Sequence, residues 1–549
     1  MKSTLKVTTV FLLFVGIVFS ANAANVKDFM PKESILYLQL EDVDAVYGEI
    51  EVSENWEKTL ALLSDVVPNW QDIQQQIVMV QGVLSTDLLS FVETVGYQTA
   101  LAVWLDETNS PQVGLAIHSG GNLGELQRFT KIVEGLIGIS GGNTLRLDAG
   151  VYQRVHYNAM EMDNSIVKYG FVDEFLVLGA GEGAFEKVMD TYRKDAPSIR
   201  ENQEFTEISK KVGAGVAVVF VDIPNALPLV NDLDEVNRKR FAIFQSLYAR
   251  LNLLETESFF QASVRFNPDL PDNEIGLFLK KGTALKTQKA LSDQDDLFVA
   301  IAPNILESVW ELVRTEMEKN ATGEMYAAIS FLEELLNLNL EEDVMTGLTG
   351  ELALSVPDFT MFDPQAVDNL NLEFDGTFVL DAGGVETDGA IIFSPSHQMK
   401  WNQIGNSLSN LQNASISQTD YNGTTVSGFA SSIYYSKLND LFLMGFSEEQ
   451  VCMLIDAIKK NKKPSYLKQV PKTPAVFAQL NLARVLETAG GGTPPADKVI
   501  VSSEEIAPLF TWISVEEDEV LFEVVLSVED TPLEVLAKLT PFYIWSMEN

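Results

Sequence analysis

Short apolar runs followed by amphipathic stretches recur along the chain and predict strands that lead into helices. In residues 175–194, four apolar residues precede a glycine-rich turn and a helical pattern. Apolar residues then recur at i, i+3, i+4 and i+7, the spacing that buries one face of a helix. They are Phe185, Val188, Met189 and Tyr192.

A second copy of this pattern predicts that the chain is internally duplicated. Residues 173–194 align without gaps on residues 439–460, with Gly179 matching Gly445. Hairpin-like and helix-like segments precede both copies, and strand-to-helix segments follow both, as expected of a repeat. The second copy has a longer loop around residues 358–375. Its apolar helical positions are Val451, Leu454, Ile455 and Ile458.

The polar turns between neighbouring apolar segments predict an α+β fold. Turns such as 106–111 and 267–274 favour antiparallel sheets, and we expect helices packed on one face. A doubly wound parallel sheet is the alternative. We predict a signal peptide, and then a larger and a smaller α+β unit in each of two tandem duplicated halves. The boundaries are 1–23 for the signal, 24–211 and 212–292 for the first half, and 293–470 and 471–549 for the second.

The first residues have the pattern of a secretory signal. Lys2 and Lys6 precede an apolar stretch at 7–19 that is too short to span a bilayer. Small residues then mark the cleavage site, with Ala21 and Ala23 before the cut and Ala24 after it. We expect an exported protein, periplasmic or extracellular, without a transmembrane segment after signal removal; an uncleaved anchor is the alternative.

Charge and composition limit the classes of partner. The formal net charge is −40, so the mean field repels nucleic acid and anionic lipid, although a local basic patch could bind either. Hydrophobic residues make up 46% of the chain, enough to bury sizeable cores. The single cysteine, Cys452, lies beside the apolar stripe of a predicted helix and is expected to be a core thiol.

The glycine-rich turn is the clearest candidate for a cofactor site. Gly179, Gly181 and Gly183 are spaced G-x-G-x-G, so the third glycine comes one residue too early for a dinucleotide loop. The second copy keeps only Gly445, followed by Ser447, a good N-cap for the next helix. We therefore interpret the turn as a strand-to-helix joint, and we expect no cofactor.

Other motifs give no catalytic or metal site. Ser165/Lys168 and Ser465/Lys468 have S-x-x-K spacing but lack the accompanying elements of penicillin-recognising enzymes. No histidine pair has metal-ligand spacing. Carboxylates are numerous, but we interpret their clusters in the sequence as turns that are exposed to solvent. The histidines are His118, His156 and His397.

Two segments resemble a known family. They are "MPKESILYLQLEDVDAVYGEI" at 30–50 and "LNLEEDVMTGLTGELALSV" at 338–356. These resemble the bacterial exported family named domain of unknown function 3352, which combines a strand, an aspartate-led helix and a later Gly-Glu before an alternating strand. Gly350-Glu351 fits this pattern, whereas the first copy has Gly96-Tyr97. The resemblance implies an exported envelope protein of undetermined function.

From these observations we expect a non-catalytic binding or interaction scaffold of the cell envelope. Its partner would be an unknown protein or an apolar ligand. A hydrolase that acts through carboxylates dispersed in sequence is one alternative, and a carrier with an apolar cavity between sheet and helices is another.

Overall fold

The computed structural model divides the chain into two compact units. One comprises residues 1–267 with 530–537, and the other comprises 268–529 with 538–549. The structure describes residues 25–66, 82, 92, 97–139, 144–162, 165–230, 234–256, 258–268, 279, 281–291, 296–302, 311, 330, 351–356, 390–393, 416–429, 433–439, 441–445, 447–460, 470–527 and 529–548.

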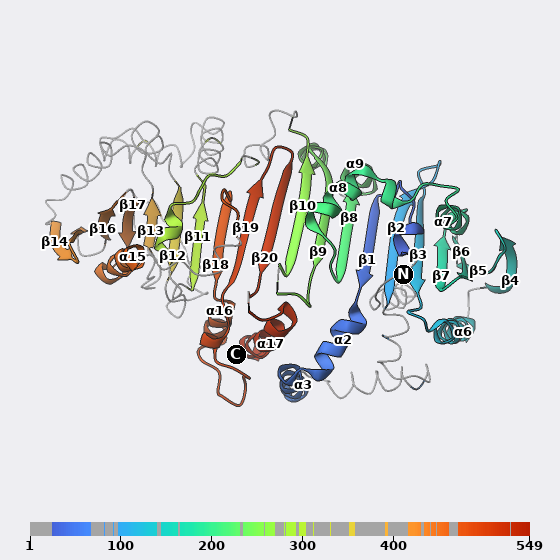
Figure 1. Cartoon of the computed structure of the whole chain (residues 1–549), viewed down its shortest axis with the longest axis horizontal. Coiled ribbons are helices and arrows are strands. Elements are labelled where there is room, and N and C mark those ends of the chain that lie inside the picture. The colour runs from blue at the N-terminus through green and yellow to red at the C-terminus, as the bar shows by residue number, and fades with distance from the viewer. Residues whose placement is uncertain are drawn as a thin grey trace. The chain divides into compact units, whose positions relative to one another are not determined.

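The strands of the first unit form one antiparallel sheet, coloured from blue to green in Figure 1. The order across the sheet is β10-β9-β8-β1-β2-β3-β7-β6-β5-β4, so the first strand lies inside the sheet. The bounds are β1 (Leu36–Glu41), β2 (Gln98–Leu105), β3 (Pro111–His118), β4 (Thr144–Tyr152), β5 (Val155–Met162), β6 (Ser165–Val172), β7 (Phe175–Ala180), β8 (Ala217–Asp222), β9 (Phe244–Leu251) and β10 (Phe260–Phe266).

Helices of the first unit pack on both faces of its sheet. The helices and 3-10 turns are η1 (Val26–Asp28), α2 (Val43–Val52), α3 (Glu54–Val66), α6 (Leu123–Ile139), α7 (Ala184–Tyr192), η2 (Ile199–Glu201), α8 (Gln203–Val212), α9 (Ile223–Ala226), η3 (Leu227–Leu229) and α10 (Glu235–Phe241). Phe205 of α8 packs its ring against Tyr37 and Tyr248 on one face. Leu126 of α6 joins a cluster with Leu101 on the other face.

The expectation of helices on a single face is therefore wrong for this unit. Successive side chains of a strand point to opposite faces, and both faces of the central strands carry apolar residues that need cover. The α+β class and the antiparallel sheets are confirmed.

The second unit has the same strand order when ten is added to each strand number. It reads β20-β19-β18-β11-β12-β13-β17-β16-β15-β14, with antiparallel pairing throughout. The bounds are η5 (Thr287–Ala290), β11 (Leu297–Ile301), β12 (Leu352–Val356), β13 (Ala390–Phe393), β14 (Ile416–Tyr421), β15 (Thr424–Phe429), β16 (Ile433–Leu438), β17 (Leu441–Gly445), α15 (Glu448–Lys460), β18 (Val476–Leu480), α16 (Leu482–Ala489), η9 (Ser503–Glu505), β19 (Leu509–Val515) and β20 (Glu519–Val525). Helix α17 (Pro532–Glu548) contributes to both units.

The core of the second unit lies between its sheet and α15. Val451, Leu454 and Ile455 of α15 are buried in one cluster with Phe298 and Phe477 of the sheet. The predicted apolar stripe of this helix is thus the face that packs on the sheet. Within the described part of the chain, no helix combines the length and apolarity needed to cross a membrane.

Candidate functional site

The sheet of the first unit carries rows of aliphatic side chains on the face opposite α7 and α8. Leu38 of β1 lies between Leu101 and Val219 of the neighbouring strands, and Ala249 follows Val219 across the sheet. A second row runs parallel to it. We define the aliphatic face of the first unit as Leu36, Leu38, Leu101, Val103, Val219, Val221, Leu247, Ala249, Ala262 and Val264.

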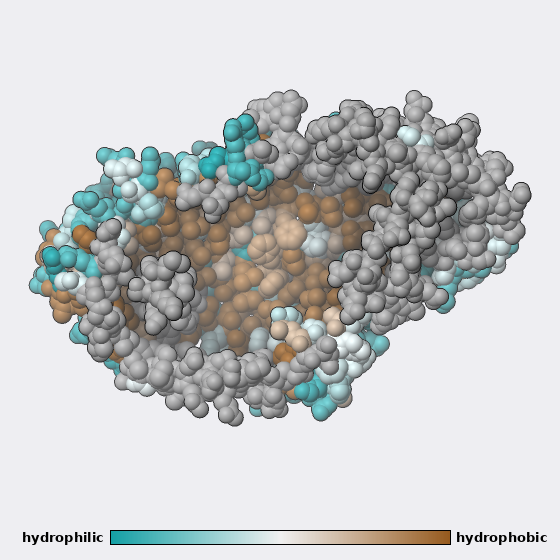
Figure 2. Space-filling view, turned by 180° about the vertical axis from the view of Figure 1, so that it is seen from behind, coloured by the Kyte–Doolittle hydropathy of each residue, from teal (hydrophilic) through white to brown (hydrophobic). Residues whose placement is uncertain are grey.

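These side chains are partly exposed. None of the ten is fully buried, although the alternate residues on the same strands, such as Tyr37 and Tyr248, are. Figure 2 shows a broad brown, hollowed area of hydrophobic residues over these strands. Because no member is charged or polar, the face offers dispersion and hydrophobic contacts alone.

The second unit has an aliphatic face of its own. Val299 of β11 lies between Leu354 and Ala478, and Ile301 lies between Leu352 and Val476. All its members are partly exposed, and Leu354 is the most open at 38%. The aliphatic face of the second unit is Leu297, Val299, Ile301, Leu352, Leu354, Val356, Val476, Ala478, Leu480, Leu509, Ile513, Phe522 and Val524, with Thr511 its one polar member.

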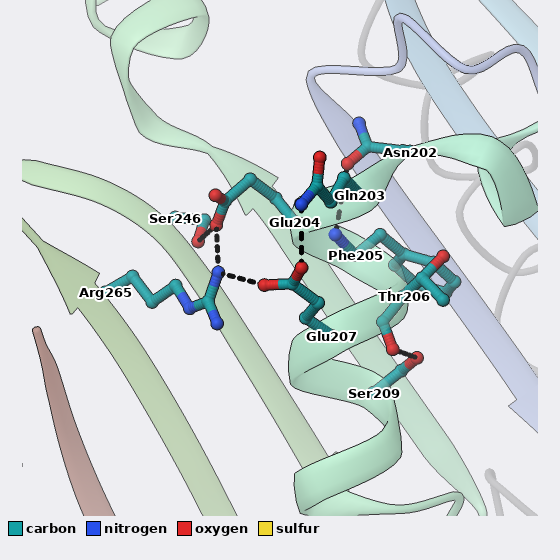
Figure 3. A network of polar contacts seen from close by, with 9 residues as sticks. All are labelled: Asn202, Gln203, Glu204, Phe205, Thr206, Glu207, Ser209, Ser246 and Arg265. Atoms are coloured by element: carbon teal, nitrogen blue, oxygen red, sulfur yellow. Dashed lines mark hydrogen bonds and ion pairs between the residues drawn. The ribbon is translucent and has the colours of Figure 1, made fainter.

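A polar network holds α8 on the opposite face of the first sheet. Arg265 of β10 binds Glu204 at 3.2 Å and Glu207 at 2.9 Å, both on α8 (Figure 3). Ser246 of β9 also donates to Glu204, at 3.1 Å, and Gln203 donates to Glu207, at 2.8 Å. Since every charge has a partner and most are near solvent, we interpret the network as a clamp for the helix and not as a catalytic site.

The second unit contains a buried carboxyl group at the start of β12. Glu351 is 4% exposed and accepts a short hydrogen bond from the main-chain N–H of Thr287 in η5. Burial raises the pKa of Glu351 to about 7, and the charge of Lys286 opposes the rise. A carboxyl group with this pKa could act in acid–base chemistry if a substrate could reach it.

A buried ion pair lies in the same unit. Asp296 is fully buried, and Arg484 of α16 donates to its Oδ1 at 3.2 Å. Arg484 also lies 4.0 Å from Glu504, which is exposed. Asn481 caps α16 by accepting a hydrogen bond from the N–H of Arg484, which fixes the helix end that carries this arginine.

The glycine-rich turn after β7 is a packing feature. A Cβ atom on Gly179 would collide with the backbone of Phe185 in α7. Gly181 and Gly183 have positive φ values of 115° and 76°, which side chains disfavour. Before α15, Ser447 accepts a hydrogen bond from Gln450 N–H at 3.2 Å, so the predicted N-cap is confirmed.

Ser165 and Lys168 are not arranged for acyl transfer. They lie three residues apart on β6, so their side chains point to opposite faces of the sheet. The ammonium group of Lys168 pairs with Glu186 and lies 5.3 Å from the ring centroid of Tyr157. These contacts indicate that the charge of Lys168 stabilises the fold and does not activate a serine.

The two described histidines have different surroundings. His118 is buried between Tyr97 and Phe175, and its Nδ1 accepts a hydrogen bond of 3.0 Å from Gly120 N–H. Burial lowers its pKa, and Glu174 opposes the shift. His156 is exposed and contacts Asp148 at 2.8 Å.

Cys452 lies on α15 and is partly buried against the core of the second unit. Burial raises the pKa of its thiol, and the nearby acids Glu448, Asp456 and Glu449 raise it further. A reactive cysteine needs a lowered pKa, so this environment favours an inert thiol.

Several sequence predictions fall outside the described residues. They concern Ala21, Ala23, Ala24, His397, Gly350, Ser465, Lys468 and the longer loop around residues 358–375. Among the residues that are described, no group of three or more histidine, cysteine or acidic side chains is placed to hold a metal ion.

The aliphatic faces and the Asp296–Arg484 pair were missed by sequence reasoning. The sequence signal that could have found part of the first face is the alternation within β1, which puts Leu36, Leu38 and Leu40 on one side of the strand. Prediction of the aliphatic rows also requires knowing which strands pair with each other, and alternation within one strand does not give this.

Comparisons with known proteins give one family and one loose structural likeness. No curated protein matches the chain. A solved structure described as crystal form I of TP0453 is similar over 46% of this chain and 83% of that chain, with 10% identity and a TM-score of 0.25. Residues 152–431, just over half of the 549 residues, match the model of the family described as Protein of unknown function (DUF3352). The chain therefore belongs to the DUF3352 family.

Proposed function

We propose that this chain is an exported, non-catalytic scaffold that binds an apolar ligand on the aliphatic faces of its two sheets. The observation that carries the proposal is the set of partly exposed aliphatic rows in each unit. Burying such surface yields about 25 cal/mol per Å². A ligand with a long alkyl or acyl part gains this energy without needing a charged partner.

A tandem duplication of the scaffold is part of the proposal. The identical strand orders support it, and so does the register. Leu36 pairs with Val103 and Val221, whereas Leu297 pairs with Val356 and Leu480 at the corresponding strand positions.

One local contact also recurs in both units. Gln98 accepts a hydrogen bond from Val26 N–H at 3.1 Å, and Glu351 accepts one from Thr287 N–H. Both donors begin a 3-10 turn. By this register the counterpart of Glu351 is Gln98, one residue after the Gly96-Tyr97 pair.

Export is proposed from the first residues of the chain. The Lys2 and Lys6 start, the apolar stretch at 7–19 and the small residues to Ala24 support it. Cell fractionation of the full chain and of a chain lacking residues 1–23 is the direct test. The full chain should be recovered outside the cytoplasm, and the shortened chain should stay inside.

A carboxylate-dependent hydrolase finds less support. Hydrolysis by carboxylates requires two acidic groups that face each other. Among the described residues, the charge that acts on the buried Glu351 is the positive charge of Lys286 and not that of a second acid. We therefore keep binding as the proposed function.

The test of binding uses one charged substitution in each unit. Leu38→Lys and Val299→Lys each place an ammonium group in the middle of one aliphatic face. A lysine can extend its charge to solvent from a partly exposed position, so both variants should fold. Circular dichroism checks this.

Binding is measured by titration with a fluorescent fatty acid, together with mass spectrometry of the organic extract of the purified protein. We expect each variant to weaken or remove one class of sites, and the double variant to remove both. Leu38→Met and Val299→Leu are the matched controls and should bind normally. No binding by the parent chain, or equal binding by the lysine variants, would contradict the proposal.

A further inference from the structure

The connection between β8 and β9, two strands that contribute to the aliphatic face of the first unit, exposes apolar side chains. Val221 and Leu247 of that face pair with each other, one pair before Asp222 and Ser246, the last pair on the side of the connection. In the connection, Leu229 is 38% exposed, Val230 47% and Phe241 43%. We define Leu229, Val230 and Phe241 as the apolar rim.

Arg238 of α10 brings the members of the apolar rim together. Its guanidinium group donates to the carbonyl oxygen of Leu227 at 3.0 Å and to that of Val230 at 3.2 Å. Phe241 lies three residues after Arg238, and residues at this spacing are neighbours on a helix surface. The hydrogen bonds therefore hold the turn with Leu229 and Val230 against the side of α10 that carries Phe241.

The charge of this segment differs from that of the whole chain. Residues 227–244 contain three acidic and three basic residues, whereas the chain has a net charge of −40. The basic residues are consecutive, Arg238, Lys239 and Arg240, and are followed directly by Phe241. Lys239 is exposed and pairs with Glu235 at 3.0 Å. Basic residues beside exposed apolar ones are typical of segments that lie in a membrane interface.

The corresponding connection in the second unit is a control within the same chain. Residues 481–508 join β18 to β19, are all described, and contain no exposed large apolar side chain. Part of this connection is held down by Trp545, which donates to the carbonyl oxygen of Gly492 at 3.0 Å. Exposure of apolar residues is therefore not a general property of this connection.

We propose that the apolar rim docks the chain on the surface of a lipid bilayer. Leu229, Val230 and Phe241 enter the interfacial layer, and Arg238 and Lys239 stay level with the lipid phosphates. The inference deepens the proposed function, because the bilayer is then the source of the apolar ligand. The docking inference can be wrong while the proposed ligand binding is right, since a ligand dissolved in water would need no membrane.

The test measures binding of the chain from residue 24 onward to phosphatidylcholine vesicles by flotation. We expect binding that persists at high salt, because the contact is mainly apolar, and that falls about tenfold or more in Leu229→Ser/Val230→Ser/Phe241→Ser. Val52→Ser/Leu60→Ser removes exposed apolar groups elsewhere in the same unit and should bind normally. Vesicles that also contain phosphatidylglycerol show how far the acidic body opposes docking.

Three results would overturn the inference. One is the absence of vesicle binding by the parent chain, and another is equal binding by the triple serine variant. The third is a dimer of the parent chain that becomes a monomer in the triple variant without any vesicle binding, since the apolar rim would then contact a second copy. Fatty-acid titration of the triple variant separates the two proposals: normal titration with lost flotation supports docking by the rim.

Discussion

The hydroxyl group of Thr59 donates a hydrogen bond of 2.8 Å to the main-chain carbonyl of Ala537. Thr59 lies on α3 and is fully buried. Pro541 lies inside α17, four residues after Ala537, and has no N–H to give to that carbonyl. The threonine hydroxyl thus supplies the donor that the proline removes.

We expect Thr59→Val to lower the free energy of unfolding by about 1 to 3 kcal/mol, because a buried carbonyl loses its donor while the shape of the side chain is kept. In a Pro541→Ala background the new N–H can bind Ala537, so the same change should cost clearly less. Urea denaturation of the four proteins measures the coupling. An equal cost in both backgrounds would refute the compensation.

Glu351 is expected to make stability depend on pH. Its folded pKa of about 7 lies above the usual carboxyl value, so the folded state prefers the protonated form. This contribution is fully present below the unfolded pKa of about 4.3 and is lost as the pH rises through about 7.

Glu351→Gln should remove that dependence, and glutamine already holds the corresponding contact at Gln98. We expect the variant to gain about 2 to 3 kcal/mol relative to the parent chain between pH 5 and pH 8. Denaturation at a series of pH values measures the difference. A difference that stays constant over this range would contradict the assigned role.

Arg484→Met should destabilise the second unit by about 3 to 5 kcal/mol, because it removes the positive charge of Arg484 from the buried carboxylate of Asp296. Asp296→Ile/Arg484→Met should recover most of this loss; by the proposed register, Ile35 occupies the corresponding position in the first unit. Glu504→Gln is the control and should have little effect, since Glu504 is exposed. Thermal unfolding ranks the variants.

Protonation of His118 should destabilise the first unit. Burial holds its pKa below the usual value, so the fold prefers the neutral ring that accepts from Gly120. Stability is then lost as the pH falls below the unfolded pKa of about 6.5 and levels off below the folded one. NMR titration of the ring protons should give a pKa below that of an unfolded histidine. A pKa at or above it would show that the buried ring tolerates charge.

Local patterns in the sequence predicted local structure well. The stripe from Phe185 to Tyr192 became α7, and the Ser447 N-cap formed as expected. Strands β4 to β6 were not predicted. Most side chains of β4 are exposed even though its apolar residues alternate, and β5 and β6 carry polar residues among the apolar ones on each face.

Long-range pairing set the rest of the fold and the candidate site. Alternation places Leu36 and Leu38 on one side of β1, but nothing in the sequence states that β8 pairs with β1. Asp296 and Arg484 lie in different segments and meet only after the sheet has formed. The pairing of Asp296 with Arg484 therefore depends on the order of the strands, and short-range periodicity in the sequence does not encode that order.

The central position of β1 determines when the first sheet can be completed. Its neighbours β2 and β8 begin only at Gln98 and Ala217, so β1 must wait for distant segments before it has a partner on each edge. Contacts between such distant segments slow folding. If the chain is exported from its N-terminus as we propose, this delay keeps the leading segment unfolded during translocation, and the sheet closes only on the far side.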